Sequence, residues 1–316
     1  MKKISAIFIA LLLICAFSCA EENYGFAFPG DKDKNPYLVV PEDLIGQEEL
    51  INTSPAKDSY RLLILGIDSY DERMSGRSDT MIIADMDFSS RELKLVSFMR
   101  DLYVSIPGKG SNRLNAAYAF GGAELLRKTL DKHFDLNVDG FIAVNFAGMI
   151  RIIDGIGGIS IEVLEDEKKP LNGILEYYNY LNGENEHEGR LEEAGFVHLS
   201  GIQAMSFARI RKIDSDYERM SRQQRVLMAA FNKTRTLPLE QIISLISENI
   251  DYVKTDIPLS DAVSLANKML SMETVTTRYL RIPVAKSFKN EMINGAYCVV
   301  PNIKKNRQKL KEFLGG

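Results

Sequence analysis

The sequence predicts a layered αβα fold built on a central mixed β-sheet and preceded by a separate N-terminal segment. Strand-like and helix-like patterns alternate along most of the chain, which is typical of α/β proteins. Hydrophobic residues make up 45% of the 316 residues and charged residues 26%, the usual balance of a globular protein. The chain is therefore long and apolar enough to form a large core that folds in water.

The first twenty residues have the pattern of an export signal. Two lysines precede an uncharged, mostly apolar run over residues 4–20, and two glutamates follow it. The apolar centre of this run is short for a membrane-spanning helix, which needs about 17–25 residues. Ser18 and Ala20 offer a small-residue cleavage pattern, and Cys19 offers a weak lipidation signal. We predict export to the outer face of the cytoplasmic membrane or the cell wall, with cleavage, lipidation and a retained anchor all open for residues 1–20.

Residues 21–59 have the composition of a spacer. They contain four prolines and many charged and asparagine side chains, with little sustained apolar periodicity. Such a segment can hold a folded body away from a membrane surface, and the alternative is an extension that packs on that body. We predict an extracytoplasmic spacer over residues 21–59 and a folded domain over residues 60–316.

Three strands are predicted at the start of the folded domain. Residues 60–67 form a continuous apolar run that suits a strand buried on both faces, and residues 80–86 and 92–99 favour two more strands. Strands that follow one another along the chain commonly pair antiparallel. The end of the first strand, the start of the second and the end of the third would then lie at one edge of the sheet.

Charged residues flank all three strands at that edge. They are Asp68 after the first strand, Arg77 and Asp79 before the second, and Arg100 and Asp101 after the third. We therefore expect these five side chains to lie close together. The strand order alone predicts a charged site.

The rest of the domain alternates between helices and strands. The predicted elements are helices over 122–133 and 146–153, strands over 138–144 and 159–163, and a long polar surface excursion over 165–193. Two capping boxes then begin helices over 200–208 and 215–232. The C-terminal part adds helices over 239–249 and 260–270, strands over 274–282 and 296–300, and a last helix over 302–313.

Several arginines are suited to a phosphorylated ligand. Arginine presents a planar fork of donors that matches phosphate oxygens, and a pyrophosphate group needs several of them. Arg209 and Arg211 point the same way if their segment is extended, and Arg219 and Gln223 share one face of the helix that follows. The candidate ligands of a pyrophosphate are Arg77, Arg100, Arg209, Arg211, Arg219 and Arg222.

The same edge offers ligands for a hard cation. Mg²⁺ (or Mn²⁺) binds through one or two carboxylates and completes its shell with water and phosphate oxygens, and Asp68 and Asp79 are the candidate carboxylates. Together with the arginines they indicate phosphoryl transfer. The alternative is that the arginines and aspartates only pair with one another on a solvated rim.

Composition excludes several other classes of protein. With 39 basic and 43 acidic side chains the formal net charge is −4, so we expect no nucleic-acid partner, whose phosphates would require an excess of basic residues. Cys298 is the one cysteine beyond the leader, so an internal disulfide of the folded domain is not expected. The three histidines lack metal-ligand spacing and lie away from the charged segments, which argues against a zinc site and a histidine-based hydrolase.

Seven ordered segments of the chain resemble the LytR-CpsA-Psr proteins of bacterial cell-wall assembly. The segments are GIDSYD (66–71), GRSDTMIIADMD (76–87), SFMRDLYVSIPG (97–108), RLNAAYAFGG (113–122), DGIGGISIEV (154–163), LSGIQAMSFARIRK (199–212) and DYERMSRQQRVL (216–227). Each is a weak signal alone, whereas seven in order at compatible spacing are specific. The resemblance covers residues 60–316.

The resemblance implies a fold and an activity. It implies a single α/β domain with an apolar cavity for a prenyl chain, and an extracytoplasmic phosphotransferase. Such an enzyme moves an anionic glycopolymer, teichoic acid or capsule-like, from an undecaprenyl-pyrophosphate carrier to peptidoglycan. The implied partners are therefore the polyprenyl-pyrophosphate-linked glycopolymer, a peptidoglycan acceptor and the membrane surface.

The resemblance also implies roles for individual residues. Asp68 and Asp79 match the family's aspartates that are associated with Mg²⁺, and Arg100 matches an arginine that contacts the pyrophosphate, with Asp101 beside it. Arg209 and Arg211 match its RxR pair, while Arg219 and Gln223 match residues of the next helix that line the head-group site. Met99 departs from the family pattern, which usually has proline before the Arg-Asp pair.

The implied chemistry is attack by a sugar hydroxyl on the polymer-proximal phosphorus, with metal and arginines stabilising the leaving undecaprenyl phosphate. Asp79 or Asp101 is a weak candidate for the general base, and deprotonation by water is the alternative. Two other functions use the same site. They are hydrolysis of a prenyl pyrophosphate, with water in place of the sugar, and binding of a polyprenyl phosphate or polymer without turnover.

Overall fold

The computed structural model describes most of the predicted folded domain. The described residues are 58–69, 74–210, 221–223, 225–226, 229–230, 233–234, 237, 241, 245, 249–258, 261, 264–265, 268 and 275–315. The predicted leader over 1–20 and nearly all of the predicted spacer lie outside this set, as does most of the predicted helices over 239–249 and 260–270. None of the helices in the described part of the chain is long and apolar enough to cross a membrane.

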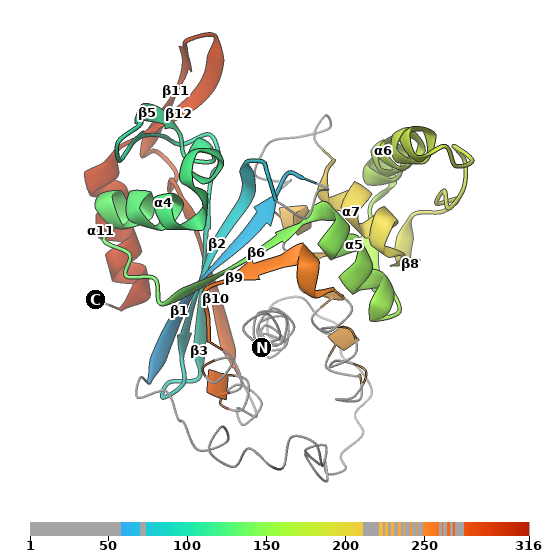
Figure 1. Cartoon of the computed structure of the whole chain (residues 1–316), viewed down its shortest axis with the longest axis horizontal. Coiled ribbons are helices and arrows are strands. Elements are labelled where there is room, and N and C mark those ends of the chain that lie inside the picture. The colour runs from blue at the N-terminus through green and yellow to red at the C-terminus, as the bar shows by residue number, and fades with distance from the viewer. Residues whose placement is uncertain are drawn as a thin grey trace.

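A six-stranded mixed sheet forms the centre of the molecule, as predicted (Figure 1). Its strands are β1 (Ser59–Ile67), β2 (Ser78–Asp87), β3 (Glu92–Phe98), β6 (Gly140–Asn145), β9 (Val253–Thr255) and β10 (Thr276–Ile282), in the order β10-β3-β2-β1-β6-β9. β1, β2 and β3 pair antiparallel with their neighbours in sequence, which confirms the prediction. β6 is parallel to β1, and β10 is parallel to β3.

These pairings give four strands a common direction. Because β1 and β3 are both antiparallel to β2, they run the same way, and their parallel partners β6 and β10 run with them. The C-terminal ends of all four strands therefore lie at one edge of the sheet. Ligands of open α/β sheets commonly bind at such an edge.

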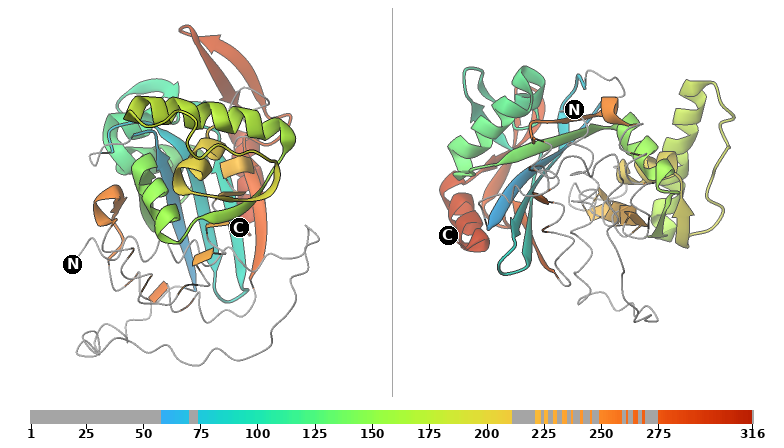
Figure 2. Two further views of the ribbon diagram at one scale, coloured as in Figure 1. Left: turned by 90° about the vertical axis from the view of Figure 1, so that its right-hand side faces the viewer. Right: turned by 60° about the horizontal axis from the view of Figure 1, so that its bottom comes forward.

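Side chains alternate between two hydrophobic cores, one on each face of the sheet. In β1, Leu62 faces the core that includes Phe207, whereas Leu63 and Leu65 face the core that includes Leu126. One face is covered by α4 (Ala116–Phe134) and α11 (Ile303–Leu314), and the other by α5 (Phe146–Gly155) and α7 (Gly201–Ala208) (Figure 2). The result is the predicted αβα layering.

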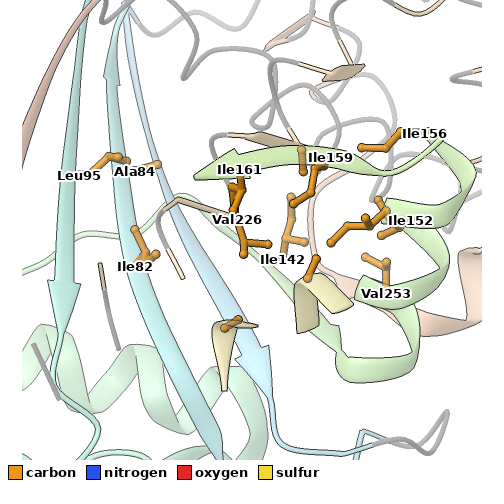
Figure 3. Packing of buried hydrophobic residues seen from close by; sticks show 14 of the residues in the cluster. Ile82, Ala84, Leu95, Ile142, Ile152, Ile156, Ile159, Ile161, Val226 and Val253 are labelled. Atoms are coloured by element: carbon orange, nitrogen blue, oxygen red, sulfur yellow. The ribbon is translucent and has the colours of Figure 1, made fainter. Parts of the chain in front are cut away.

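The core that includes Phe207 extends from the sheet into a small hairpin. β7 (Ile159–Val163) and β8 (Gly195–Leu199) pair antiparallel. Figure 3 shows Ile159 and Ile161 of β7 among the same packed side chains as Ile142 of the sheet and Ile152 of α5. This hairpin anchors the start of α7 because Ser200, which follows β8, caps that helix by accepting a hydrogen bond from the Gln203 N–H. The predicted capping box is thus confirmed.

Two further hairpins are absent from the prediction, although the strand over 296–300 in the second of them was predicted. One is β4 (Tyr103–Ile106) with β5 (Gly110–Arg113), and the other is β11 (Phe288–Ile293) with β12 (Ala296–Pro301). The second projects from the body (Figure 1). A short 3₁₀ helix, η2 (Ile250–Tyr252), leads into β9. The β4–β5 pair matters most, because it carries Arg113 back toward the end of β3.

The predicted surface excursion over 165–193 is wrong in its first part. Residues Glu165–Asn182 form α6, an eighteen-residue helix. Pro170 and Gly173 weaken the helical signal in the sequence. Leu171, Leu175 and Tyr178 nevertheless recur on one face and are all buried, so tertiary packing outweighs local propensity.

Candidate functional site

The end of β1 and the start of β2 bring the first two predicted residues together. Ile67 lies opposite Ser78, and the Asp68 N–H donates to the Arg77 carbonyl at 2.9 Å. The side chains of Asp68 and Arg77 are exposed. A carboxylate and a guanidinium group therefore extend from neighbouring positions at the edge of the sheet.

A β-bulge sets the position of Asp79. Gly66 pairs with Thr80 and Ile67 pairs with Ser78, so Asp79 is one extra residue on β2. Bulges redirect side chains and are common beside functional sites. Gly66 suits this close approach, because a Cβ there would lie 2.9 Å from the Thr80 Cβ.

Two donors hold the Asp79 carboxylate. Arg100, two residues beyond β3, places Nη1 2.6 Å from Asp79 Oδ2. Asn115 Nδ2 donates to Asp79 Oδ1 at 3.3 Å. Asn115 is the N-cap residue of α4, but its side chain makes no capping bond there. Its backbone N–H donates to the Arg100 carbonyl (3.1 Å), which ties this turn to the end of β3.

Asp101 lies between two arginines. Its Oδ2 is 3.4 Å from Arg100 Nε, and its Oδ1 accepts a hydrogen bond from Arg113 Nη1 at 3.3 Å. Asp101 is buried. Sequence reasoning missed Arg113, although it begins the quoted segment RLNAAYAFGG, because the β4–β5 hairpin was not predicted. We call the group Asp79, Arg100, Asp101, Arg113 and Asn115 the edge cluster.

Arg209 reaches the same edge from α7. Its guanidinium carbon is 4.5 Å from the centre of the Phe146 ring, and its Nη1 donates to the Tyr178 hydroxyl. Phe146 begins α5 directly after β6, and its N–H donates to the Ser69 carbonyl at 3.0 Å. Arg209 is therefore connected through Phe146 to the residue that follows Asp68.

The predicted alignment of Arg209 with Arg211 is not supported at Arg209. Its backbone (φ −98°, ψ −1°) closes α7 and is not extended. Arg211 and Arg219 lie outside the described residues. Gln223 is helical and partly buried. Arg222, also proposed as a ligand, is buried (2% exposed) and turned toward Glu167 of α6, so its prediction as an accessible ligand is wrong.

The donor set fits a hard divalent cation that takes part of its shell from a ligand. Among the described residues no group of three or more His, Cys, Asp or Glu side chains could enclose a metal. Mg²⁺ needs only one or two carboxylates when water and phosphate oxygens complete the shell, and Asp68 and Asp79 supply that number. Asn115 donates to Asp79 through Nδ2, and its Oδ1 is a buried oxygen that has no hydrogen-bond partner within the described structure, so this oxygen is a further candidate ligand.

The arrangement is suited to an anion with several oxygens. Arg100 and Arg113 keep 19% and 26% of their side chains exposed, so a ligand at the edge can reach their guanidinium groups. Arg77 lies directly before β2, and Arg209 lies at the end of α7. An open groove of about 290 Å³ lies between α5, α6 and α7, with Tyr178 and Arg151 among its lining residues.

Comparisons with known proteins give one consistent result. The LytR_cpsA_psr family matches residues 41–313. The chain is 30% identical to the polyisoprenyl-teichoic acid–peptidoglycan teichoic acid transferase TagU of Enterococcus faecalis, over 84% of this chain and 82% of the relative. It is 27% identical to the corresponding transferase TagT of Bacillus subtilis, over 86% and 83%. The structure of TagT bound to LI-WTA aligns with a TM-score of 0.64 and 25% identity, over 84% of this chain and 94% of that one.

Proposed function

The chain belongs to the LytR_cpsA_psr family, and from this membership and the edge cluster we infer that it is a glycopolymer phosphotransferase. Its donor is an anionic glycopolymer linked to a polyprenyl pyrophosphate, and its acceptor is a sugar hydroxyl of peptidoglycan. The names of the relatives TagU and TagT, teichoic acid transferases that act on peptidoglycan, support this inference. The reaction takes place outside the cytoplasm at the membrane surface.

The observation that carries the inference is the meeting of Arg100, Arg113 and Asp79 at the C-terminal ends of the strands. Asp101 neighbours both arginines and Asp79 accepts from Arg100, so the guanidinium groups are oriented before any ligand arrives. Preoriented donors are the main means by which proteins stabilise phosphoryl transfer. Both arginines also remain partly accessible, so a ligand can reach them.

The proposed function gives each residue of the site a role. Arg100 and Arg113 bind the pyrophosphate oxygens, and Arg77 and Arg209 add positive charge from either side. Arg211, Arg219 and Gln223 stay predicted ligands of the same group. Asp68 and Asp79 would hold Mg²⁺ or Mn²⁺, which would draw electron density from the phosphate oxygens.

The group transfer is a single displacement at phosphorus. The acceptor hydroxyl oxygen forms a bond to the polymer-proximal phosphorus, and the bond between that phosphorus and the bridging oxygen breaks. Undecaprenyl phosphate leaves with its charge stabilised by the guanidinium groups. The hydroxyl proton passes to Asp79, Asp101 or water.

The N-terminal residues 1–20 serve export, and a retained anchor is the form we propose for them. An anchor places the site where a prenyl-linked donor is embedded. Cleavage and lipidation of Cys19 are the other outcomes. Fractionation of cells that express the full chain separates them, because a purely soluble extracellular product would exclude both the anchor and the lipid.

The function is tested with the full chain in detergent. The chain is incubated with a prenyl-pyrophosphate-linked sugar polymer, Mg²⁺ and peptidoglycan fragments, and the products are identified by mass spectrometry. Polymer joined to peptidoglycan through a phosphodiester is the expected product, and it should be lost in Arg100→Ala but kept in Arg190→Ala, an exposed arginine far from the edge cluster in sequence. Release of polymer without acceptor would instead identify a hydrolase, and binding without any product would identify a non-catalytic binder.

A further inference from the structure

A second group of charged side chains lies beneath α6, and two of its three members are almost completely buried. Arg222 Nη1 is 3.4 Å from Glu167 Oε1, and Arg225 Nη1 is 2.9 Å from the same oxygen. The side chains of Arg222 and Glu167 are 2% and 4% exposed. We call Glu167, Arg222 and Arg225 the α6 cluster.

Glu167 is fixed at the start of α6. Its Oε2 accepts a hydrogen bond from the Leu164 N–H at 3.0 Å, which completes the first turn of the helix, and Arg225 Nη2 lies 3.3 Å from the same oxygen. Arg225 also stacks on the Phe207 ring of α7, with its guanidinium carbon 4.8 Å from the ring centre. Both carboxylate oxygens of Glu167 are therefore engaged.

Arg222 connects this carboxylate to the segment that carries Arg209. Its Nη2 donates to the Ile210 carbonyl at 3.2 Å. Ile210 is itself buried and directly follows Arg209. The planar guanidinium group thus bridges Glu167 of α6 and the backbone next to a predicted pyrophosphate ligand.

Tyr178 makes a second connection from α6 to the same segment. It lies eleven residues after Glu167, three turns along the same buried face of the helix. Its hydroxyl accepts a hydrogen bond from Arg209 Nη1, and its ring lies 5.4 Å from the Arg209 guanidinium carbon. One helix therefore holds both the backbone and the side chain of the Arg209 segment.

We propose that α6 positions Arg209 for the pyrophosphate group, with Glu167 acting through Arg222 on the backbone and Tyr178 acting directly on the guanidinium group. The proposal rests on the proposed function, because it takes Arg209 to be a head-group ligand. Buried charge pairs add little net stability compared with apolar packing, so a requirement for defined geometry is the better explanation of this one. Fixed supporting contacts are what place a binding group within the tolerance that its ligand demands.

The test is a double-mutant cycle on the full chain, with binding of farnesyl pyrophosphate measured by calorimetry. Arg222→Lys keeps a positive charge opposite Glu167 but lacks the fork that also reaches Ile210. Tyr178→Phe keeps the ring and removes the acceptor. Each change should weaken binding about three- to tenfold in the wild-type background and have little effect in an Arg209→Ala background, because interacting sites are not additive.

Folding is measured in parallel by thermal unfolding. Glu165→Gln is the matched control, since Glu165 lies in the first turn of α6 but its side chain is 77% exposed and pairs with Lys168. It should change neither binding nor stability. If Arg222→Lys fails to fold, Tyr178→Phe decides the proposal alone, because the shape of its ring is unchanged.

The outcomes separate the two levels of inference. Equal losses of binding with and without Arg209, or no loss in either background, would overturn the positioning role while the proposed function stands. A wild-type chain that is folded by thermal unfolding but does not bind farnesyl pyrophosphate would overturn the proposed function and the positioning role together.

Discussion

Two groups of arginines and acids lie in this domain, one at the edge of the sheet and one beneath α6. In the edge cluster the side chains of Arg100 and Arg113 are 19% and 26% exposed. In the α6 cluster the side chains of Arg222 and Glu167 are 2% and 4% exposed. The residue types are the same, but Arg222 and Glu167 cannot be reached from solvent, whereas Arg100 and Arg113 can.

The two clusters differ in which acceptors the guanidinium groups contact. Arg222 donates to a carboxylate and to the Ile210 carbonyl, both inside the protein. Arg100 and Arg113 contact carboxylates at the end of β3 and keep an accessible side. A ligand can bind to Arg100 and Arg113, whereas Arg222 determines where other groups of the protein lie. Variants of the two clusters should therefore differ in which property they lose.

The largest effect is expected from Glu167→Ala, and it should be a loss of stability. The change removes the carboxylate that neutralises two buried or half-buried arginines, and an uncompensated buried charge costs about 3–5 kcal/mol. Denaturant unfolding of the full chain measures this loss. Glu176→Ala is the control, because Glu176 pairs with Arg190 near the surface and should change stability by less than about 1 kcal/mol. Equal small losses from both variants would remove the contrast between the clusters.

The next largest effect is expected from Arg100→Lys, and it should be a loss of turnover with folding retained. A lysine supplies a point charge in place of a planar fork, so it cannot contact Asp79, Asp101 and a phosphate group together. The cost should be about 3 kcal/mol, a hundredfold or more in rate, close to that of Arg100→Ala. Steady-state kinetics and a melting curve test it. Near-normal turnover would mean that only a generic positive charge is needed at this position.

Asp68→Asn should change the dependence of turnover on metal. Asp68 is exposed at the end of β1, so replacing its carboxylate should leave folding intact. The change should weaken the binding of the cation that we propose Asp68 shares with Asp79. The Mg²⁺ concentration for half-maximal turnover should rise by about tenfold, or ~1.4 kcal/mol. A titration with Mg²⁺ after treatment with a chelator measures this. An unchanged titration would remove Asp68 from the metal site.

The smallest effect is expected from Asp87→Ala, a carboxylate outside both clusters. Hydrogen bonds from the backbone N–H groups of Ser90 and Ser89 lower the pKa of Asp87. Because the folded-state pKa is below the unfolded value, Asp87 stabilises the fold above the unfolded pKa of about 3.9, and this is lost as pH falls through the folded value. The variant should lose about 0.5–1 kcal/mol at neutral pH. The loss of stability in the variant should be present at pH 7 and should shrink as the pH falls through the folded-state pKa of Asp87. A difference between variant and wild type that stays constant with pH would contradict this origin.

Much of the edge cluster could be predicted without a structure. Residues 60–67, 80–86 and 92–99 have strong strand patterns, and short connections force neighbouring strands to pair antiparallel. That local rule is enough to bring Asp79 and Arg100 together, and the structure confirms their contact at 2.6 Å. The predicted capping box at Ser200 was confirmed for the same reason, since both of its hydrogen bonds lie within four residues.

The sequence by itself determined the family, the sheet edge and five of the charged residues at that edge, because each depends on patterns within one or two adjacent elements. The helix α6, the approach of Arg113 to Asp101 and the burial of Arg222 were decided by tertiary structure alone. Arg222 and Glu167 are 55 residues apart in sequence, and no local pattern distinguishes an arginine that will meet a buried carboxylate from one that will face a ligand. Burial is a property of the whole packed molecule, and it is burial that separates Arg222 and Glu167 from the arginines of the edge cluster.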